Sequence, residues 1–593
     1  MKRSEVKEEY RWRLEDIFLS LAEWERQLQL LNRDIVGILR FKGRLAEKEQ
    51  LLACLKSADD LGQRIEKLYA YAMLKKDENL ADTKAGELKS KIQTLLVQYN
   101  SYAAFITPEL SNLAESTLES LILDSDFSAY DYMLGQILKN KKHILSEGEE
   151  RVLALAGKTT GAFREIFSAI DNVDLTFGFI NLPDGSKERL THGKYGLWMQ
   201  NKDGAFRRRV FLSMYKTYEQ SIYTIGANFS ASINKDNFLA AVRHHDSALE
   251  KSLSSNDVPV AVYDTLLTEV DKRLGVLHDY MAFRKKTLAL DELHMYDLSV
   301  PMFEKADLQL SFSEAYDVMI EGLKPMGVEY SQLLRKARQN RWIDVEETDN
   351  KWSGAYMRGV YGVHPYVLLN YTPTTHDVFT IAHEMGHAAH SYYSAKFQPY
   401  AKNDYAIFVA EVASTVNEVL LLKHLLKTAK DNHTKKYLWS YYLDMFRTTL
   451  FRQTMFAEFE RDIHEAEKKG VPLTVDYLSK AYLKLNKKYY GTHVSHDRQI
   501  RLEWARIPHF YSAFYVYQYA TGLTAAVCIA NAILSDTSGE AFKKYKAFLS
   551  AGGHKSPFEI LKDTGIDLLS SQPYDIAFGE FERALAELKA LVG

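Results

Sequence analysis

The stretch Thr374-Thr-His-Asp-Val-Phe-Thr-Ile-Ala-His383-Glu384-Met-Gly-His387-Ala-Ala-His390-Ser contains the pattern from which fold and function are inferred. In an α-helix, residues four positions apart lie about 40° apart around the axis and one turn along it. His383 and His387 can therefore bind one metal ion. Glu384 then lies beside the open coordination position, where a metal-bound water would be. The spacing predicts a zinc hydrolase.

The residues around these histidines are typical of an amphipathic helix. Thr374 or Thr375 can cap its N-terminus, and Asp377 adds negative charge to its first turn. Apolar residues recur at helical spacing and predict the face that packs on the core: Val378, Ala382, Met385, Ala389 and Tyr392. The two histidines fall nearly opposite this stripe, so we expect them to line a cleft.

A second helix that carries carboxylates is predicted to begin near Phe408. Glu411 and Glu418 share one face of this helix, and the opposite face is apolar, with Val412, Val416, Val419 and Leu420. Burying a glutamate on such a helix is costly unless the carboxylate is paired or binds a metal. We therefore predict Glu411 as the third metal ligand; a surface position for Glu411 is the alternative.

Two other residues compete for the third ligand position. His390 shares the face of His387, but one straight helix does not easily place three side chains tetrahedrally around an ion. The extended pattern with a third histidine fails, because His390 and Tyr393 occupy its glycine and last histidine positions. Glu418 is better placed to accept a hydrogen bond from a ligating imidazole and so orient it.

The two helices together resemble the oligoendopeptidase F family of zinc metallopeptidases, relatives of thimet oligopeptidase and neurolysin. The resemblance extends beyond the metal site to several motifs in the same order: Trp12-Arg-Leu-Glu-Asp-Ile-Phe-Leu-Ser20, Gly354-Ala-Tyr356, Pro365-Tyr-Val-Leu-Leu-Asn-Tyr371, Trp504-Ala-Arg-Ile-Pro-His509-Phe-Tyr511 and Phe514-Tyr-Val-Tyr-Gln-Tyr-Ala-Thr-Gly522. It implies one zinc ion per chain. It also implies a mainly α, two-lobed zincin-type fold with a deep substrate channel and a small β-element beside the active-site helix.

Composition and length support a helical protein in two parts. With 593 residues the chain is too long for one compact core. Glycine and proline are scarce (30 and 12), and apolar and charged residues alternate at helical spacing from about residue 20 to 160. A small β-hairpin is predicted around Pro183-Asp-Gly185. We place the boundary after it, with an N-terminal lobe of residues 1–200 and a catalytic domain of residues 201–593.

Charge and cysteine content exclude several classes of protein. The net charge of −3 argues against nucleic acid or an anionic membrane as a partner, because both usually require a surplus of basic residues. The two cysteines, Cys54 and Cys528, imply no disulfide framework. We expect no signal peptide, no membrane span and a cytoplasmic enzyme. The sequence leaves the oligomeric state open.

Residues 504–522 contain the predicted donors for the reaction's developing charge. Amide hydrolysis places negative charge on the former carbonyl oxygen, which a neutral histidine or tyrosine can stabilise. The resemblance implies that donors come from this region, and we expect His509 and Tyr511, followed by Tyr515; ordinary packing is the alternative for each tyrosine. By the same resemblance, the extended segment at Tyr366 and Leu368 is expected to bind the substrate backbone along a strand edge.

The expected activity is that of a zinc-dependent oligoendopeptidase. It would hydrolyse internal bonds of short unstructured peptides with metal-activated water and Glu384 as general base. The substrate class follows from the resemblance. One alternative is an exopeptidase that releases C-terminal dipeptides, which would require a cation for the terminal carboxylate. The other is a non-catalytic helical protein that binds peptides, against which the intact Glu384 argues.

Overall fold

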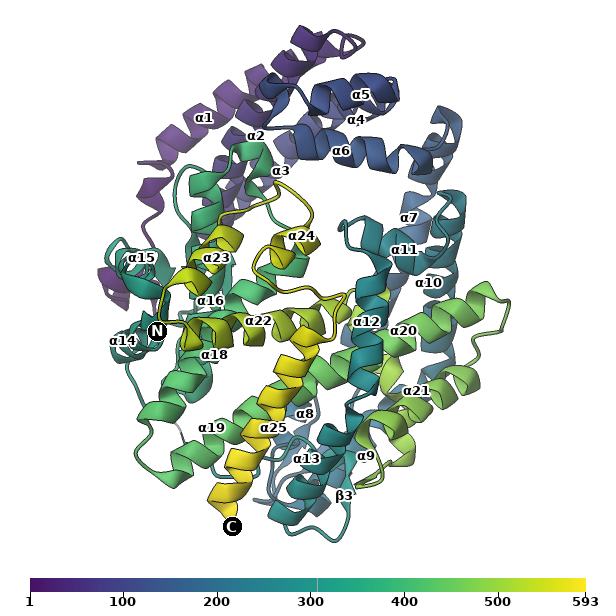
Figure 1. Cartoon of the computed structure of the whole chain (residues 1–593), viewed down its shortest axis with the longest axis vertical. Helices are drawn as coiled ribbons and strands as arrows, with labels where there is room; N and C mark the ends of the chain where they lie inside the picture. Colours follow the sequence, from purple (N-terminus) through teal and green to yellow (C-terminus); the bar gives the residue numbers. More distant parts are fainter. Residues whose placement is uncertain (307) are drawn as a thin grey trace. The chain divides into compact units, whose positions relative to one another are not determined.

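The computed structural model describes residues 1–306 and 308–593, which are helical along most of their length with a few short strands (Figure 1). The predicted fold class, a mainly α protein with a small β-element, is confirmed. Among the helices of the described residues, none combines the length and hydropathy that crossing a bilayer requires.

The chain forms two compact units, each built from three separate parts of the sequence. Unit 1 comprises Met1–Ile144, Asp307–His424 and Ile529–Gly565, and unit 2 comprises Leu145–Ala306, Leu425–Cys528 and Ile566–Gly593. These units differ from the predicted boundary near residue 200, because helices distant in the sequence pack together within each unit. A division at a single position cannot describe such an arrangement.

Unit 1 contains helices and a three-stranded sheet. Its helices are α1 (Leu21–Asp34), α2 (Lys48–Asp77), α3 (Thr83–Ala103), α4 (Ile106–Ser111), α5 (Glu115–Ile122), α6 (Asp131–Asn140), α14 (Phe312–Gly322), α15 (Gly327–Gln339), α16 (Thr375–Phe397), α17 (Tyr400–Asn403), α23 (Glu540–Leu549) and α24 (Pro557–Lys562). One apolar core joins α1, α2 and α3 to the sheet, since Trp24 and Leu68 pack in the same cluster as Tyr366 and Leu368.

The sheet of unit 1 lies against α16 and has the order β4-β6-β5. Its strands are β4 (Ile343–Asp344), β5 (Tyr356–Arg358) and β6 (Tyr366–Leu368). β6 pairs parallel with β4 and antiparallel with β5, with Val367 opposite both Ile343 and Met357. The predicted β-element beside the active-site helix is therefore present.

Unit 2 is a second helical assembly. Its helices are α7 (Glu147–Ala169), α8 (His192–Trp198), α9 (Gly204–Gln220), α10 (Ile222–Val242), α11 (Ala248–Ser254), α12 (Val260–Asp271), α13 (Leu274–Thr287), α19 (Asn432–Met445), α20 (Arg452–Lys468), α21 (Val475–Tyr490) and α25 (Gln572–Val592). The predicted hairpin is confirmed as β1 (Phe179–Asn181) paired antiparallel with β2 (Lys187–Arg189). β3 (Leu293–His294) pairs parallel with β7 (Val494–Ser495). Two further helices, α18 (Ile407–Thr428) and α22 (Tyr517–Ser535), each include one of the positions at which the chain passes from one unit to the other.

Candidate metal centre

α16 presents the two histidines of the sequence motif on one face. The Thr374 hydroxyl caps the helix by accepting a hydrogen bond from the Asp377 backbone N–H at 3.2 Å. The opposite face is buried in unit 1, as the apolar stripe predicts for Val378, Ala382, Met385 and Ala389. Packing on that face leaves His383 and His387 only partly covered, with 30% and 15% of their side chains exposed.

Three side-chain atoms from α16 and α18 form a compact triangle. His383 Nε2 lies 3.2 Å from His387 Nε2 and 3.6 Å from Glu411 Oε2, and His387 Nε2 lies 3.7 Å from the same Oε2. A tetrahedral zinc ion with bonds of about 2.1 Å places its ligand atoms about 3.4 Å apart. The three predicted ligands therefore fit one zinc ion and leave its fourth position open.

The close approach of α18 to α16 depends on a glycine and an asparagine that the sequence analysis did not identify. A Cβ on Gly386 would lie 2.6 Å from both the Ala413 carbonyl oxygen and Ser414 Cα. Asn417, fully buried, donates from Nδ2 to the Ala382 carbonyl at 2.9 Å and accepts from the Tyr330 hydroxyl at 3.0 Å. Together these contacts bring Glu411 within reach of the histidines.

Two hydrogen bonds orient the ligand atoms. His383 Nδ1 lies 2.6 Å from Glu418 Oε1, which assigns the proton to Nδ1 and directs the Nε2 lone pair toward the triangle. The Ser414 hydroxyl donates to Glu411 Oε2 at 3.1 Å. The structure thus brings Glu418 to the position expected of an orienting carboxylate.

The two imidazoles of the triangle differ strongly in acidity. Burial alone would lower the pKa of His383, but the hydrogen bond to Glu418 and the nearby charges of Glu418, Glu384 and Glu411 raise it to about 9. Burial and the neighbouring charge of His383 lower the pKa of His387 to about 3. A proton in this site therefore resides on His383, and His387 offers a free lone pair.

Glu384 is held in an environment that suits proton transfer. Its side chain is buried, and desolvation, followed by the charges of Glu411 and Glu418, raises its pKa to about 7 against the opposing effect of His383. Its Oε2 has no hydrogen-bond partner among the described residues. A buried carboxylate oxygen without a protein partner, next to three metal-type donors, fits a site that holds a metal and a water molecule.

Comparisons with known proteins identify the family of the chain. The sequence model of Peptidase family M3 matches residues 197–580, and that of Oligopeptidase F matches residues 109–177. The chain belongs to peptidase family M3. The resemblance to oligoendopeptidase F proteins is confirmed, and the protein is a metallopeptidase that hydrolyses peptide bonds.

This M3 peptidase is similar to relatives over its whole length. Oligopeptidase PepF of Bacillus subtilis is 41% identical over 592 residues, which cover 100% of this chain and 88% of the relative. Group B oligopeptidase PepB of Streptococcus agalactiae is 38% identical, covering 100% and 98%. Among solved structures, oligoendopeptidase-F from Enterococcus faecium is 35% identical, with a TM-score of 0.74 over 96% of this chain and 99% of that chain. A Chlamydophila abortus protein described as a peptidase is 34% identical, with a TM-score of 0.94 over 100% and 99%.

In the three-stranded sheet of the peptidase, the free strand edge lies on a different strand from the one predicted. Tyr366 and Leu368 lie on β6, which is the central strand, so their main-chain groups face β5 instead of an open edge. Val367 N donates to the Trp342 carbonyl on the β4 side. Its antiparallel partner Met357 therefore directs its own N–H and C=O away from β6. The open edge beside α16 belongs to β5.

A cavity of about 830 Å³ borders this edge within unit 1. Met357, Gly359, Ser391 and Ala410 contribute to its lining, together with residues of α2 and α3. Ser391 is one helical turn beyond His387, and Ala410 immediately precedes Glu411. The cavity therefore adjoins both metal-binding helices, and it is large enough for several side chains of a peptide.

The predicted oxyanion donors of the peptidase lie in unit 2. His509 is exposed, and its ring lies 6.1 Å from the ring of Tyr515 and 6.0 Å from that of Tyr519, a tyrosine absent from the prediction. Partial desolvation of the ring by surrounding protein atoms, followed by the charges of Arg452 and Arg164, lowers the pKa of His509, which favours the neutral imidazole.

Tyr511 differs from its neighbours in being buried. Its ring stacks on Phe167 at 4.6 Å between centroids, and its hydroxyl accepts a hydrogen bond from Asn228 Nδ2 at 3.3 Å. Burial raises the pKa of Tyr511. The phenol therefore keeps its proton, which it can donate to another oxygen.

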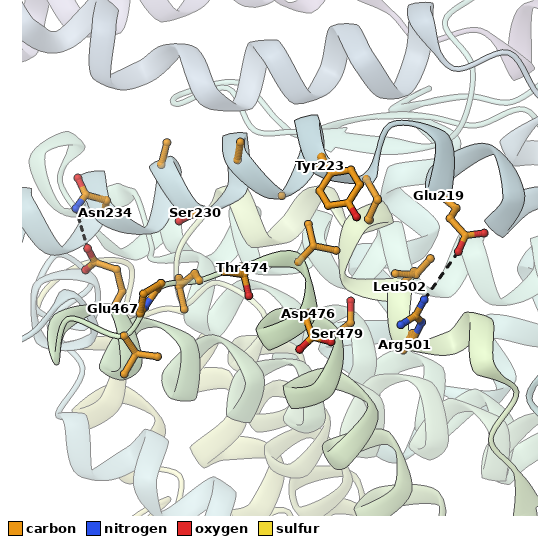
Figure 2. A pocket seen from close by; sticks show the side chains of 18 of the residues that line it. Glu219, Tyr223, Ser230, Asn234, Glu467, Thr474, Asp476, Ser479, Arg501 and Leu502 are labelled. Atoms are coloured by element: carbon orange, nitrogen blue, oxygen red, sulfur yellow. Dashed lines mark hydrogen bonds and ion pairs between the residues drawn. The ribbon is translucent and has the colours of Figure 1, made fainter.

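Unit 2 also contains a larger cavity of about 1070 Å³ between α10 and the segment that leads into α21 (Figure 2). It contains none of the predicted site residues. Its charged groups already have partners: Glu219 lies 3.8 Å from Arg501, Glu467 accepts from Asn234 at 2.7 Å, and Asp476 pairs with Lys480 at 2.6 Å. Nothing in its chemistry indicates a ligand.

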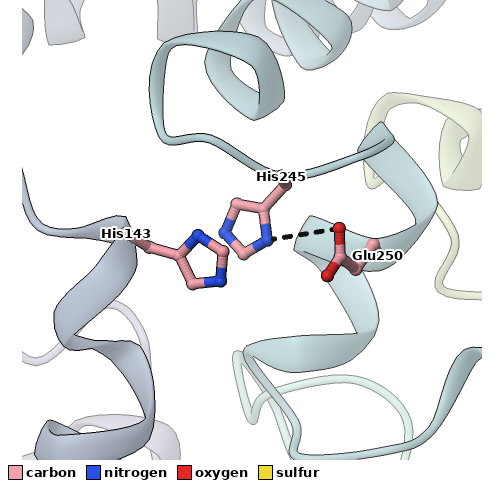
Figure 3. Close-up of side chains that lie close together, drawn as sticks. All are labelled: His143, His245 and Glu250. Carbon is pink, nitrogen blue, oxygen red and sulfur yellow. Dashed lines mark ion pairs between the residues drawn. The ribbon is translucent and has the colours of Figure 1, made fainter.

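A second histidine–carboxylate pair occurs in unit 2, where His245 Nδ1 lies 3.9 Å from Glu250 Oε2 (Figure 3). His143, which the figure also labels, belongs to unit 1. The pair by itself supplies two ligand atoms, whereas catalytic zinc sites use three protein ligands. We assign no metal to it.

Proposed function

We propose that this protein is a zinc-dependent oligoendopeptidase that hydrolyses internal bonds of short, unstructured peptides. The observation that carries the proposal is the triangle of His383 Nε2, His387 Nε2 and Glu411 Oε2, with separations of 3.2 to 3.7 Å, beside the buried Glu384. His383, His387 and Glu411 would hold the ion. When bound, zinc supplies Lewis-acid polarisation of the scissile carbonyl and lowers the pKa of a coordinated water.

Glu384 moves the protons of the reaction. Its pKa of about 7 lets the carboxylate accept a proton from the attacking water and the resulting acid return that proton to the departing amine. A carboxylate with an ordinary pKa would be a weaker base toward the attacking water. Burial of Glu384 is thus part of its function.

The segment around His509 supplies hydrogen-bond donors for the developing oxyanion. His509 and Tyr515 are accessible, and their contact with one another limits the directions in which each can point. Tyr511 acts alongside them through the free proton of its hydroxyl. These roles follow from the family resemblance and from the protonation states that burial favours.

The open edge of β5 binds the substrate backbone. The N–H and C=O of Met357 point away from the sheet, so an extended peptide can add as a further strand whatever its side chains are. The adjoining cavity would receive the peptide's side chains. The relatives named oligopeptidases support short peptides as the substrate class, and the two buried free thiols fit the predicted cytoplasmic location.

Metal analysis and peptide cleavage test the proposal together. Purified protein should contain one zinc per chain and cleave an internally quenched fluorogenic peptide whose two termini are blocked. A carboxydipeptidase would require the free C-terminus and leave the blocked peptide intact. A protein that binds the peptide with full zinc content but does not cleave it would contradict any catalytic role.

A further inference from the structure

Glu460 is a buried carboxyl group that the proposed mechanism does not use. It lies on α20 in unit 2, and its fully buried side chain interacts electrostatically with Tyr263 and Asp236. Among the described residues, no salt bridge to Glu460 is found and its Oε2 has no hydrogen-bond partner. Burial raises the pKa of Glu460 well above its usual range, so the group is a neutral acid.

The other carboxyl oxygen of Glu460 binds the backbone of a residue in a strained conformation. Its Oε1 accepts a hydrogen bond from the Phe514 backbone N–H at 3.0 Å. Phe514 has a φ of 56°, in the left-handed region that costs a bulky residue about 1–3 kcal/mol. Such a conformation persists only where surrounding contacts impose it.

Three further contacts hold the same turn. The Phe514 ring is buried and packs edge-on against Tyr263, with centroids 5.9 Å apart, and at a tilt against His464, with centroids 4.6 Å apart. From the other side, the Ser252 hydroxyl donates to the carbonyl of Ala513 at 2.9 Å. Glu460 and Ser252 thus bind the N–H and the C=O of one peptide group, the bond between Ala513 and Phe514.

This turn lies between the predicted donors. It follows the 3₁₀-helix Pro508–Tyr511 and precedes α22, so it determines how the chain after His509 returns to place Tyr515 beside it. The resulting cluster of His509, Tyr515 and Tyr519 rings, with centroids 5.5 to 6.1 Å apart, depends on the path through Phe514.

We infer that Glu460 is a positioning residue of the peptidase: by binding the Phe514 N–H it fixes the turn that sets His509 and Tyr515 in their relative geometry. This inference rests on the proposed role of these two residues in stabilising the oxyanion. Glu460 does not touch the substrate. Its effect reaches the reaction through the backbone of residues 512–515.

Two substitutions of Glu460 distinguish the effect of its hydrogen bond from the effect of its side-chain volume. Glu460→Gln keeps a neutral acceptor for the Phe514 N–H, so kcat should stay within about threefold of wild type. Glu460→Met removes the acceptor at similar volume, so kcat should fall about 10–100-fold while KM changes little. Glu458→Met is the matched control. This buried glutamate on the same helix binds Lys488 and Tyr489, so its loss should lower the melting temperature and leave kcat intact.

A double-variant cycle tests whether Glu460 acts through His509. In a protein that already carries His509→Ala, adding Glu460→Met should lower kcat by less than about threefold, because the imidazole that Glu460 positions is already absent. If Glu460→Met does not fold, Ser252→Ala releases the turn from its other side and should lower kcat a few-fold, again only when His509 is present.

The outcomes distinguish this inference from the function on which it rests. Equal losses from the glutamine and methionine variants, unchanged kcat in Glu460→Met, or full additivity with His509→Ala would overturn the positioning role while wild-type cleavage stands. A wild-type protein that loads zinc but does not cleave the blocked peptide would overturn both. Zinc content of each variant, which depends on ligands in unit 1, monitors the integrity of the metal site.

Discussion

Glu384 is the single residue on which the proposed proton transfers depend. Replacing it by glutamine keeps the shape of the side chain and removes its basicity, so we expect kcat to fall roughly 10²–10⁴-fold. Zinc content should not change, because the carboxylate of Glu384 is not one of the three ligand groups. Metal analysis with steady-state kinetics checks both expectations. His383→Ala is the contrasting variant, which should lose zinc and activity together, whereas wild-type turnover in Glu384→Gln would exclude the general-base role.

Glu418 controls how a proton competes with the metal. Its hydrogen bond to Nδ1 helps raise the pKa of His383 to about 9, so below pH 9 a metal ion must displace a proton. Zinc affinity should therefore fall about tenfold for each pH unit below 9. In Glu418→Ala the pKa of His383 drops and the dependence between pH 7 and 9 should flatten, while affinity at pH 9 falls about 10–100-fold.

Competition with a chelator of known affinity measures these curves. Glu418→Gln is the matched variant, since it retains an acceptor for Nδ1 and removes only the charge; its affinity at pH 9 should lie between those of wild type and Glu418→Ala. Identical slopes for wild type and Glu418→Ala would show that His383 is not the group that titrates.

At the same scale, local chemistry determined which site residues could be predicted. His383, His387 and Glu411 follow from helical spacing and from the cost of burying a charge, both of which act within one or two turns of helix. The hydrogen bonding of Tyr511 cannot be predicted in this way, because the partner of its hydroxyl, Asn228, is 283 residues away in the sequence. Glu460 was missed for the same reason: its partner Phe514 is 54 residues away, and nothing local marks the strained turn.

Among the elements, the contact between α16 and α18 builds the metal site. Gly386→Ala would place a methyl group 2.6 Å from the backbone of α18 at Ala413 and Ser414, and backbone cannot yield as a flexible side chain would. We expect α18 to be displaced, with a loss of about 1–3 kcal/mol in the free energy of unfolding and weaker zinc binding. Denaturant unfolding and chelator competition would measure the two effects.

Gly135→Ala is the matched control for this substitution. Gly135 lies within α6, and a Cβ there meets nothing within 4 Å, so alanine should stabilise the helix by about 0.5–1 kcal/mol. A Gly386→Ala protein with wild-type stability and zinc affinity would show that the helices have room to separate without moving Glu411.

A helix or strand could be predicted where the residue pattern within its own segment defines it. Its place in the fold could not be predicted where distant segments determine it. The period of apolar residues predicts α16 and α18, and Pro183-Asp-Gly185 predicts the hairpin of β1 and β2. The strand at 366–368 is also apparent from its composition, but its central position is not. That position is set by β4 and β5, whose short segments carry too few residues to show an alternating pattern.

For the whole molecule, the decisive property is that each compact unit collects three distant parts of the chain. Residues 1–144 and 307–424 share the core around Tyr366 and Leu368, so truncation near residue 200 would not leave a complete metal-binding unit. No repeat and no low-complexity linker in the sequence marks these exchanges. Long-range packing, not any linker, defines the units.

The same division predicts where zinc stabilises the molecule. All three ligands belong to unit 1, so zinc at 100 times its Kd should raise the free energy of opening there by about 2.7 kcal/mol. Amide hydrogen exchange in α16 and α18 up to His424 should therefore slow by roughly a hundredfold on zinc addition. Exchange in α10 and α20 of unit 2 serves as the internal control and should change little. Protection that rises equally in both units would mean that the units open as one cooperative whole, and protection that leaves α18 unaffected would remove Glu411 from the ligand set.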